Sequence, residues 1–215
     1  MLGPWKIVGV MMLSILCGCS LVTEEDLADL RSQNAFVRQR ALKRLGTPAN
    51  IGIPFIGPNA DKKNSKEAVD IIADLLCKAE NNKEMKLNML SALKCLCVGT
   101  GVVVPNEIIK TMLKDSDREV RHRSIQLAAD VKAKNTLPLL VDSLGKNQED
   151  TYNIIWALGE IRDPRAIPVL NDLVDSKDKY DRYNAYNALE KIRQNSPEKE
   201  RLRPLNVARW FFRRL

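Results

Sequence analysis

The stretch DTYNIIWALGEIRDPRAIPVLNDLV, residues 150–174, decides the fold. Apolar side chains recur at helical spacing from Ile154 to Leu158, and a second apolar helical segment begins at Arg165. Pro164 lies between the two segments, and proline is tolerated in the first turn of a helix, where its missing N–H is not needed. The stretch therefore predicts two helices joined by a short turn.

Four other segments align without gaps with the first of these helices. They are VRQRALKRLG from Val37, MKLNMLSALK from Met85, VRHRSIQLAA from Val120 and DRYNAYNALE from Asp181. With residue 150 included, the starting points are 48, 35, 30 and 31 residues apart, and a period near 30 is typical of a two-helix solenoid. A further helical pattern precedes each segment, at residues 25–30, 66–78, 107–113, 137–144 and 165–174.

Three aligned positions of the repeated helix carry apolar or small side chains in nearly every copy. We expect these positions to form the core, because each repeat can bury its apolar face only against its neighbours. They hold Ala41, Met89, Ser124, Ile154 and Ala185; Leu42, Leu90, Ile125, Ile155 and Tyr186; and Leu45, Leu93, Ala128, Leu158 and Leu189.

Residues 158–174, LGEIRDPRAIPVLNDLV, resemble the HEAT-like repeat of the phycobilisome lyases. The shared pattern is a helix ending in Leu-Gly, then Asp-Pro, Ala-Ile-Pro and a second apolar helix. The resemblance implies an all-α fold, a right-handed α-solenoid of about five HEAT-like two-helix repeats over residues 25–195. Residues 47–65 have the glycine and proline density of a loop insert. The resemblance specifies little about function, since HEAT-like arrays bind proteins or DNA, attach bilins or carry di-iron hydroxylases.

Residues 1–20, MLGPWKIVGVMMLSILCGCS, have the layout of an export signal. Lys6 precedes an apolar run that is too short to span a bilayer comfortably. The sequence Leu16-Cys17-Gly18-Cys19 resembles the bacterial lipobox, which implies cleavage after residue 18 and acylation of Cys19. Cys17 fits less well, because bulky Leu16 would then occupy the small-residue position. An uncleaved membrane anchor and a cytosolic first helix are the alternatives.

A lipid anchor defines where the mature chain works. Residues 1–18 are then a signal peptide and residues 19–24 a lipidated tether, and several acyl chains hold a protein stably on a membrane. The expected location is the bacterial cell envelope. Ser20 follows the lipidated cysteine, and by resemblance to envelope lipoproteins a non-acidic residue there favours the outer membrane.

A more polar face of the repeated helix forms a predicted binding strip. Two aligned positions, one turn apart, make up this face, which lines the concave surface in HEAT-like solenoids. They hold Arg40, Asn88, Arg123, Asn153 and Asn184, and Lys43, Ser91, Gln126, Trp156 and Asn187. Trp156 either packs under the next repeat or contacts a partner, since tryptophan and arginine are common in interface hot spots. Tyr152 and Tyr183 are expected to pack between repeats with their hydroxyls at the surface.

Another aligned position carries mostly basic residues: Arg38, Lys86, Arg121, Thr151 and Arg182. By resemblance to the family, the arginine at this position forms a structural ion pair with an aspartate of the preceding turn, and contact with a substrate is the alternative. For Arg121 the expected partner is Asp115 or Asp117. Guanidinium groups suit such pairing with carboxylates.

Residues for catalysis or metal binding are scarce. His122 is the single histidine, so neither a zinc site nor a Ser-His-Asp triad has enough members. The glycine-containing stretch from Gly99 lacks the lysine and the spacing of a phosphate loop. Cys77 either forms a disulfide with Cys95 or Cys97, or all three remain buried free thiols. We therefore expect no catalytic residue, no cofactor and no metal site.

The C-terminal segment, residues 196–215, is basic and aromatic. It accounts for much of the formal net charge of +7. As a helix it is suited to the membrane interface, or alternatively to capping the last repeat. The candidates for membrane contact are Arg209, Trp210, Phe211, Phe212 and Arg213.

These features together favour a membrane-anchored, non-catalytic scaffold or adaptor that binds a protein partner. The first alternative is a lyase-like protein that handles a chromophore or cofactor through a groove cysteine. The second is a nucleic-acid-binding HEAT protein, which requires that the signal is not cleaved, because an exported chain rarely meets nucleic acid.

Overall fold

The computed structural model describes residues 22–46, 62–78 and 82–194. In these ranges the chain forms ten α-helices, two short 3-10 helices and no strand. The α-helices are α2 (Glu24–Arg31), α3 (Ala35–Gly46), α4 (Lys62–Lys78), α5 (Lys83–Thr100), α6 (Asn106–Met112), α7 (Arg118–Asp130), α8 (Leu137–Ser143), α9 (Gln148–Ile161), α10 (Ile167–Val174) and α11 (Lys179–Gln194). The 3-10 helices are η1 (Lys134–Thr136) and η2 (Pro164–Ala166).

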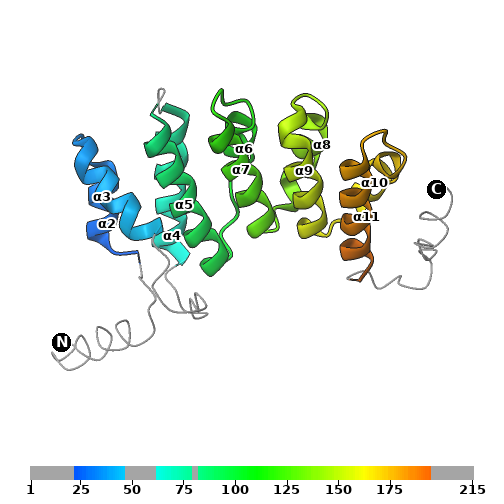
Figure 1. The fold of residues 1–215 in the computed structure, drawn as a ribbon. Coiled ribbons are helices and arrows are strands. Elements are labelled where there is room, and N and C mark those ends of the chain that lie inside the picture. The colour runs from blue at the N-terminus through cyan, green and yellow to red at the C-terminus, as the bar shows by residue number, and fades with distance from the viewer. Residues whose placement is uncertain (1–21, 47–61, 79–81, 195–215) are drawn as a thin grey trace.

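The helices form five pairs that stack side by side into an α-solenoid (Figure 1). The second helices of the pairs, α3, α5, α7, α9 and α11, pack on one another along the whole array. The first helices, α2, α4, α6, α8 and α10, contact one another much less. The second helices therefore form the inner row of the solenoid. The predicted strip lies on the solvent-facing side of this row.

Local sequence signals define the helix ends. Thr23 and Asp26 form a capping box at the start of α2, and the carboxylate of Asp117 accepts backbone N–H groups at the start of α7. Pro138 and Pro168 lie in the first turns of α8 and α10, as the sequence predicts. Arg162 ends α9 in a left-handed conformation with φ of 55°.

The core runs continuously through the array, and the three predicted core positions belong to it. All fifteen residues at these positions are buried except Tyr186, which is partly exposed. Gly159 marks the closest approach between repeats, because a Cβ added there would lie 2.8 Å from the Cα of Ala188 in α11. That interface requires a residue without a side chain.

The loop insert predicted at residues 47–65 extends too far towards the C-terminus. Helix α4 already begins at Lys62, and Ser65 is a buried residue of its first turns. The predictions for residues 1–18, for Cys19 and for the tail from 196 to 215 lie outside the described residues. None of the described helices is both long and apolar enough to cross a membrane.

Candidate functional site

The predicted strip follows the inner row from α3 to α11. Its residues differ in exposure along the array. Arg40, Lys43 and Arg123 are exposed, whereas Asn88, Ser91, Gln126, Asn153, Trp156, Asn184 and Asn187 are half-buried. The structure thus brings all predicted positions onto one row of helices but divides them into two different surfaces.

The half of the strip nearer the N-terminus is a surface of ion pairs between repeats. Lys43 of α3 lies 3.4 Å from Glu84 of α5, and Arg40 lies 3.7 Å from Asp29 within its own repeat. Lys83 of α5 contacts Glu119 at 2.9 Å, and the hydrogen bond to that carboxylate raises the pKa of the lysine. These charges already have partners in the array, which reduces what they offer to a ligand.

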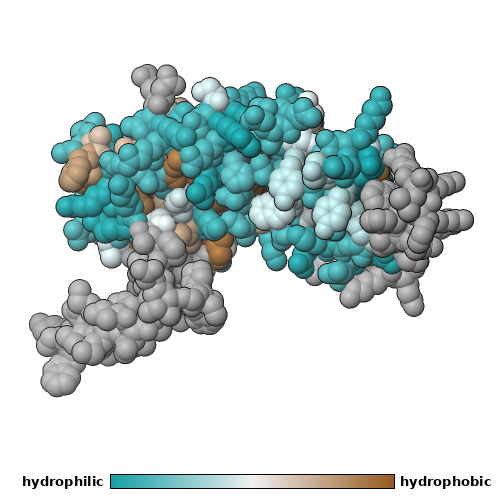
Figure 2. All heavy atoms as spheres, viewed as in Figure 1, coloured by the Kyte–Doolittle hydropathy of each residue, from teal (hydrophilic) through white to brown (hydrophobic). Residues whose placement is uncertain are grey.

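The half over α9 and α11 carries aromatic and amide side chains instead. We name this surface the aromatic–amide patch, and it consists of Tyr152, Asn153, Trp156, Tyr183, Asn184 and Asn187. Tyr152 is 54% exposed and Tyr183 60% exposed. The expectation that both tyrosines pack between repeats is therefore wrong, because more than half of each residue is exposed. Figure 2 shows side chains of intermediate hydropathy gathered over these two helices.

Trp156 both packs against neighbouring side chains and keeps part of its surface accessible to a partner. Part of its side chain packs against the hydrophobic core, and the residue remains half-buried rather than enclosed. Asn184 donates a hydrogen bond of 2.7 Å from Nδ2 to the carbonyl of Tyr180, which leaves its Oδ1 oxygen available as an acceptor. The patch thus offers aromatic faces beside amide groups, a composition common in protein-binding surfaces.

A hollow of about 760 Å³ adjoins the patch at the N-terminal ends of α7 and α9. Tyr152 and Asn153 line it on one side and Arg118 and Glu149, 3.3 Å apart, on the other. His122 also lines the hollow. Exposed Arg123 has no ion-pair partner within the part of the chain that the structure describes. Arg123 and the hollow thus lie beside the aromatic–amide patch, whose own residues are uncharged.

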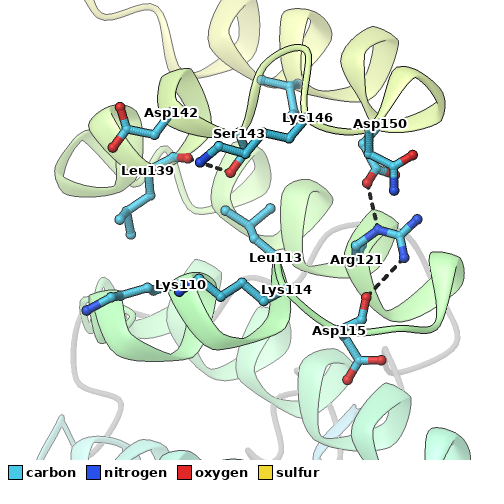
Figure 3. Close-up of a pocket in the computed structure, with 12 residues that line it drawn as sticks. Lys110, Leu113, Lys114, Asp115, Arg121, Leu139, Asp142, Ser143, Lys146 and Asp150 are labelled. Atoms are coloured by element: carbon cyan, nitrogen blue, oxygen red, sulfur yellow. Dashed lines mark hydrogen bonds and ion pairs between the residues drawn. The ribbon is translucent and has the colours of Figure 1, made fainter.

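A second cavity, of about 450 Å³, lies between the third and fourth repeats (Figure 3). At its wall, Nε of buried Arg121 donates to Asp150 of the next repeat at 2.6 Å. The Nη1 group donates to the backbone carbonyls of Asp115 and Ser116, each at 3.0 Å. The predicted pairing of Arg121 with the carboxylate of Asp115 or Asp117 is therefore wrong. The preceding turn supplies carbonyl groups, and the carboxylate comes from the following repeat.

The offset of one repeat is the signal that would have identified Asp150. Arg121 and Asp150 are 29 residues apart, and so are Lys86 and Asp115, whose Nζ and Oδ2 atoms lie 2.6 Å apart. Asp150 is the first residue of its repeat in the alignment, but a pattern within one repeat does not identify its side chain as the partner of Arg121. Searching for opposite charges one period apart would have found both pairs.

Cys77, Cys95 and Cys97 are free thiols, although only one of them is buried. Cys77 is exposed, Cys95 is half-buried and Cys97 is buried, and none forms a disulfide. Burial raises the pKa of the Cys97 thiol to about 12, so its reactive thiolate form is scarce at neutral pH. Among the described residues, no three histidine, cysteine or carboxylate side chains converge to hold a metal ion.

Comparisons with known proteins agree with this architecture. Residues 105–190 and 146–205 match the family described as HEAT repeats. A crystal structure of an engineered protein from a structural genomics consortium superimposes with a TM-score of 0.52 at 18% identity, covering 89% of this chain and 85% of that one. A designed armadillo repeat protein is 20% identical over 80% of this chain and 100% of its own, with a TM-score of 0.38. No curated protein matches the sequence.

Proposed function

We propose that the chain acts as a non-catalytic scaffold that binds a protein partner while a lipid anchor holds it on a membrane. The α-solenoid fold and the match of residues 105–190 and 146–205 to HEAT repeats support the scaffold. The aromatic–amide patch carries this proposal. On this part of the inner row, the exposed rings of Tyr152 and Tyr183 occupy the aligned position that holds Gln39, Leu87 and His122 in the first three repeats. Aromatic residues supply much of the binding energy in protein interfaces.

The chemistry of the patch indicates how a partner binds. The rings of Tyr152 and Tyr183 offer apolar surface that a partner can cover, and their hydroxyl groups remain able to form hydrogen bonds. The amides of Asn153 and Asn187 can donate to and accept from a polypeptide backbone. Exposed Arg123 at the margin adds a positive charge that favours an acidic side chain of the partner.

The anchor in this proposal is acylated Cys19, which places the solenoid in a bacterial cell envelope, with the outer membrane favoured by Ser20. The support is the signal layout of residues 1–20. The tail from 196 to 215 would add a second membrane contact. Intact mass spectrometry of the membrane fraction tests the anchor, because an acylated chain that begins at Cys19 is the expected species and a chain that begins at Met1 contradicts it.

The lyase-like alternative requires a reactive cysteine in a groove. The buried Cys97 thiol does not meet this requirement, whereas exposed Cys77 lines a hollow between the second and third repeats and is the cysteine that this alternative would use. Binding of nucleic acid requires a basic inner surface. The lysines that line the first repeats of that surface are paired with carboxylates of neighbouring repeats, which weighs against this second alternative.

Co-purification from native membranes tests the binding patch. Tyr152→Ala combined with Tyr183→Ala is expected to weaken capture of the partner at least about 30-fold, because truncating a hot-spot residue costs about 2 kcal/mol or more. Phe36→Ala is the matched control, since Phe36 is 71% exposed on α3, in the first repeat and away from the patch. Equal capture by the double variant and the control, with unchanged melting temperatures, would contradict the proposal.

A further inference from the structure

The solenoid has two long edges with different loop chemistry. The inter-repeat edge consists of the C-terminal ends of the second helices and the loops that lead to the next repeat, and it lies at the bottom of Figure 1. The opposite edge consists of the turns inside each repeat. Because the repeats stack in register, each edge collects one kind of loop from every repeat.

The charges of the two edges have opposite signs. The described inter-repeat loops carry four cations, Lys132, Lys134, Arg162 and Arg165. Their single carboxylate, Asp163, is buried and forms an ion pair of 2.7 Å with Arg165. The described turns inside the repeats carry three lysines, Lys114, Lys146 and Lys177, against four aspartates, Asp115, Asp117, Asp175 and Asp178. The helix ends that adjoin the inter-repeat loops add the carboxylates of Glu107, Asp130 and Glu160, each of which is paired with a lysine. The described inter-repeat loops are therefore basic, and the described turns inside the repeats are slightly acidic.

Exposed apolar side chains also lie on the basic edge. Val103 is 68% exposed in the loop after α5, and Val98 is 44% exposed in the last turn of that helix. Figure 2 shows hydrophobic side chains at the lower margin of the molecule in this region. Apolar side chains beside lysines are typical of surfaces that rest on lipid headgroups.

The edge is a continuous surface rather than a set of separate loops. The amide of Asn135 donates to Asn106 of the preceding repeat, and Nη2 of Arg165 donates to the carbonyl of Lys134 at 3.0 Å. These contacts join the loops of the third, fourth and fifth repeats. They hold Lys134 and Arg165 at fixed positions on the same side.

The described chain begins and ends at this edge. The carbonyl of Val22 accepts a hydrogen bond of 3.2 Å from Asn64 at the start of α4, and α11 ends at Gln194 on the same side, at the other end of the array (Figure 1). Glu24 and Glu25 in the first turn of α2 are offset there by exposed Lys62, Lys63 and Lys66. Three residues of chain span at most about 10 Å, so an acyl group on Cys19 would hold Val22 within that distance of the headgroups.

We propose that the inter-repeat edge lies against the anionic headgroups of the bilayer that holds the lipid anchor. The inference rests on the proposed anchoring at Cys19. In this orientation Lys132 and Lys134 contact headgroups, Val98 and Val103 enter the interface, and the acidic edge faces away from the membrane. The array then lies along the membrane, and its inner row, with the aromatic–amide patch, remains open to a partner.

Vesicle cosedimentation of the mature chain, residues 19–215 with Cys19→Ser, tests the edge without the acyl chains. The vesicles are phosphatidylcholine with about a third phosphatidylglycerol, and pure phosphatidylcholine is the reference. Lys132→Gln with Lys134→Gln is expected to weaken binding about 30-fold, because each lysine near an anionic surface contributes about 1 kcal/mol. Lys114→Gln with Lys177→Gln removes the same charge from the opposite edge and is expected to change binding by less than about twofold.

Two outcomes overturn the proposal: equal weakening by both pairs of substitutions, or no weakening by the first pair. Intact mass of the wild-type protein from cells separates this result from the question of the anchor. Acylated Cys19 together with equal behaviour of the two pairs overturns the edge alone. A chain without acylation whose vesicle binding still depends on Lys132 and Lys134 overturns the anchor alone.

Discussion

The packing of α7 on α9 and the packing of α9 on α11 use the same architecture with different chemistry. The first interface contains the buried pair of Arg121 and Asp150 and, at the surface, the pair of Arg118 and Glu149. In the second, Thr151 occupies the position of Arg121, and Gly159 lies against Ala188. The second interface also has an ion pair, Lys191 with Glu160, but that pair is partly exposed. A buried ion pair therefore distinguishes the first interface, and a close glycine contact distinguishes the second.

This difference shows how a repeat array frees surface for binding. Where charged residues connect neighbouring repeats, their hydrogen-bonding capacity is used within the array. Over α9 and α11, the position that holds Gln39, Leu87 and His122 in the first three repeats carries Tyr152 and Tyr183, which remain exposed. The aromatic–amide patch lies over the second type of interface. The following changes test this contrast, beginning with the largest expected effect.

Arg121→Met should lower the free energy of unfolding by about 3 kcal/mol, because it leaves Asp150 buried without its cation. Chemical denaturation measures the loss. The double variant Arg121→Met with Asp150→Leu should recover most of it, since apolar pairs replace buried ion pairs well. A single variant as stable as the wild type would show that charge does not hold this interface.

Gly159→Ala should cost about 1 to 2 kcal/mol, because the new methyl group would clash with the backbone of Ala188. The clash exceeds the gain in helix propensity that this substitution normally brings. Thermal unfolding measures the effect. Gly145→Ala provides no matched control because its φ is 74°, so Asn171→Ala at an exposed position of α10 serves instead. Unchanged stability of Gly159→Ala would contradict the close-packing account.

Thr151→Arg should convert the second interface toward the first and raise stability by up to about 1 kcal/mol. Asp181 occupies the position equivalent to Asp150, and Arg182 and Arg121 both donate to carbonyls five and six residues earlier, which a new arginine could copy. Denaturation of Thr151→Arg with and without Asp181→Asn measures the new pair. A stability gain that survives removal of Asp181 would contradict the proposed pairing.

The pH dependence of two aspartates should have opposite signs. Hydrogen bonding to Arg165 lowers the pKa of Asp163, so its contribution is present above the unfolded pKa and is lost as pH falls. Burial, with a smaller effect of Asp178, raises the pKa of Asp181, so stability is lost as pH rises through its folded pKa.

At pH 7 Asp163→Asn should therefore destabilise the protein and Asp181→Asn should stabilise it, each by about 0.5 kcal/mol. Asparagine still caps a helix, so the first change isolates the charge. Melting temperatures measured from pH 7 down to about pH 3 should show both differences shrinking near the unfolded pKa of about 3.9. Differences of the same sign would contradict the assignment.

The sequence was sufficient for the architecture because period and hydrophobic pattern specify stacked helices directly. The second helices and their core positions follow from the alignment that starts at Val37, Met85, Val120, Asp150 and Asp181. The predicted loop insert at 47–65 includes residues 62–65, which the structure places in the first turn of α4. These residues are polar, so they add no apolar period that would predict a helix.

The site was harder to predict, because its features depend on contacts between repeats. Exposure of Tyr152 and Tyr183 depends on how neighbouring repeats pack, which a single-repeat pattern does not encode. The partner of Arg121 lies in the next repeat, beyond the local turn that the family resemblance suggested. The strip positions were found by alignment, but the division into ion pairs and a neutral patch required the structure.

Site-specific photocrosslinking in native membranes tests the central claim most directly. A photoreactive residue at Tyr183 probes the aromatic–amide patch, and one at exposed Asp172 on the first-helix row probes the outer side of the same repeat. The account predicts one defined protein adduct from position 183, lost with Tyr152→Ala, and no such adduct from position 172. The same adducts from both positions, or none from position 183, would contradict a partner-binding surface over α9 and α11.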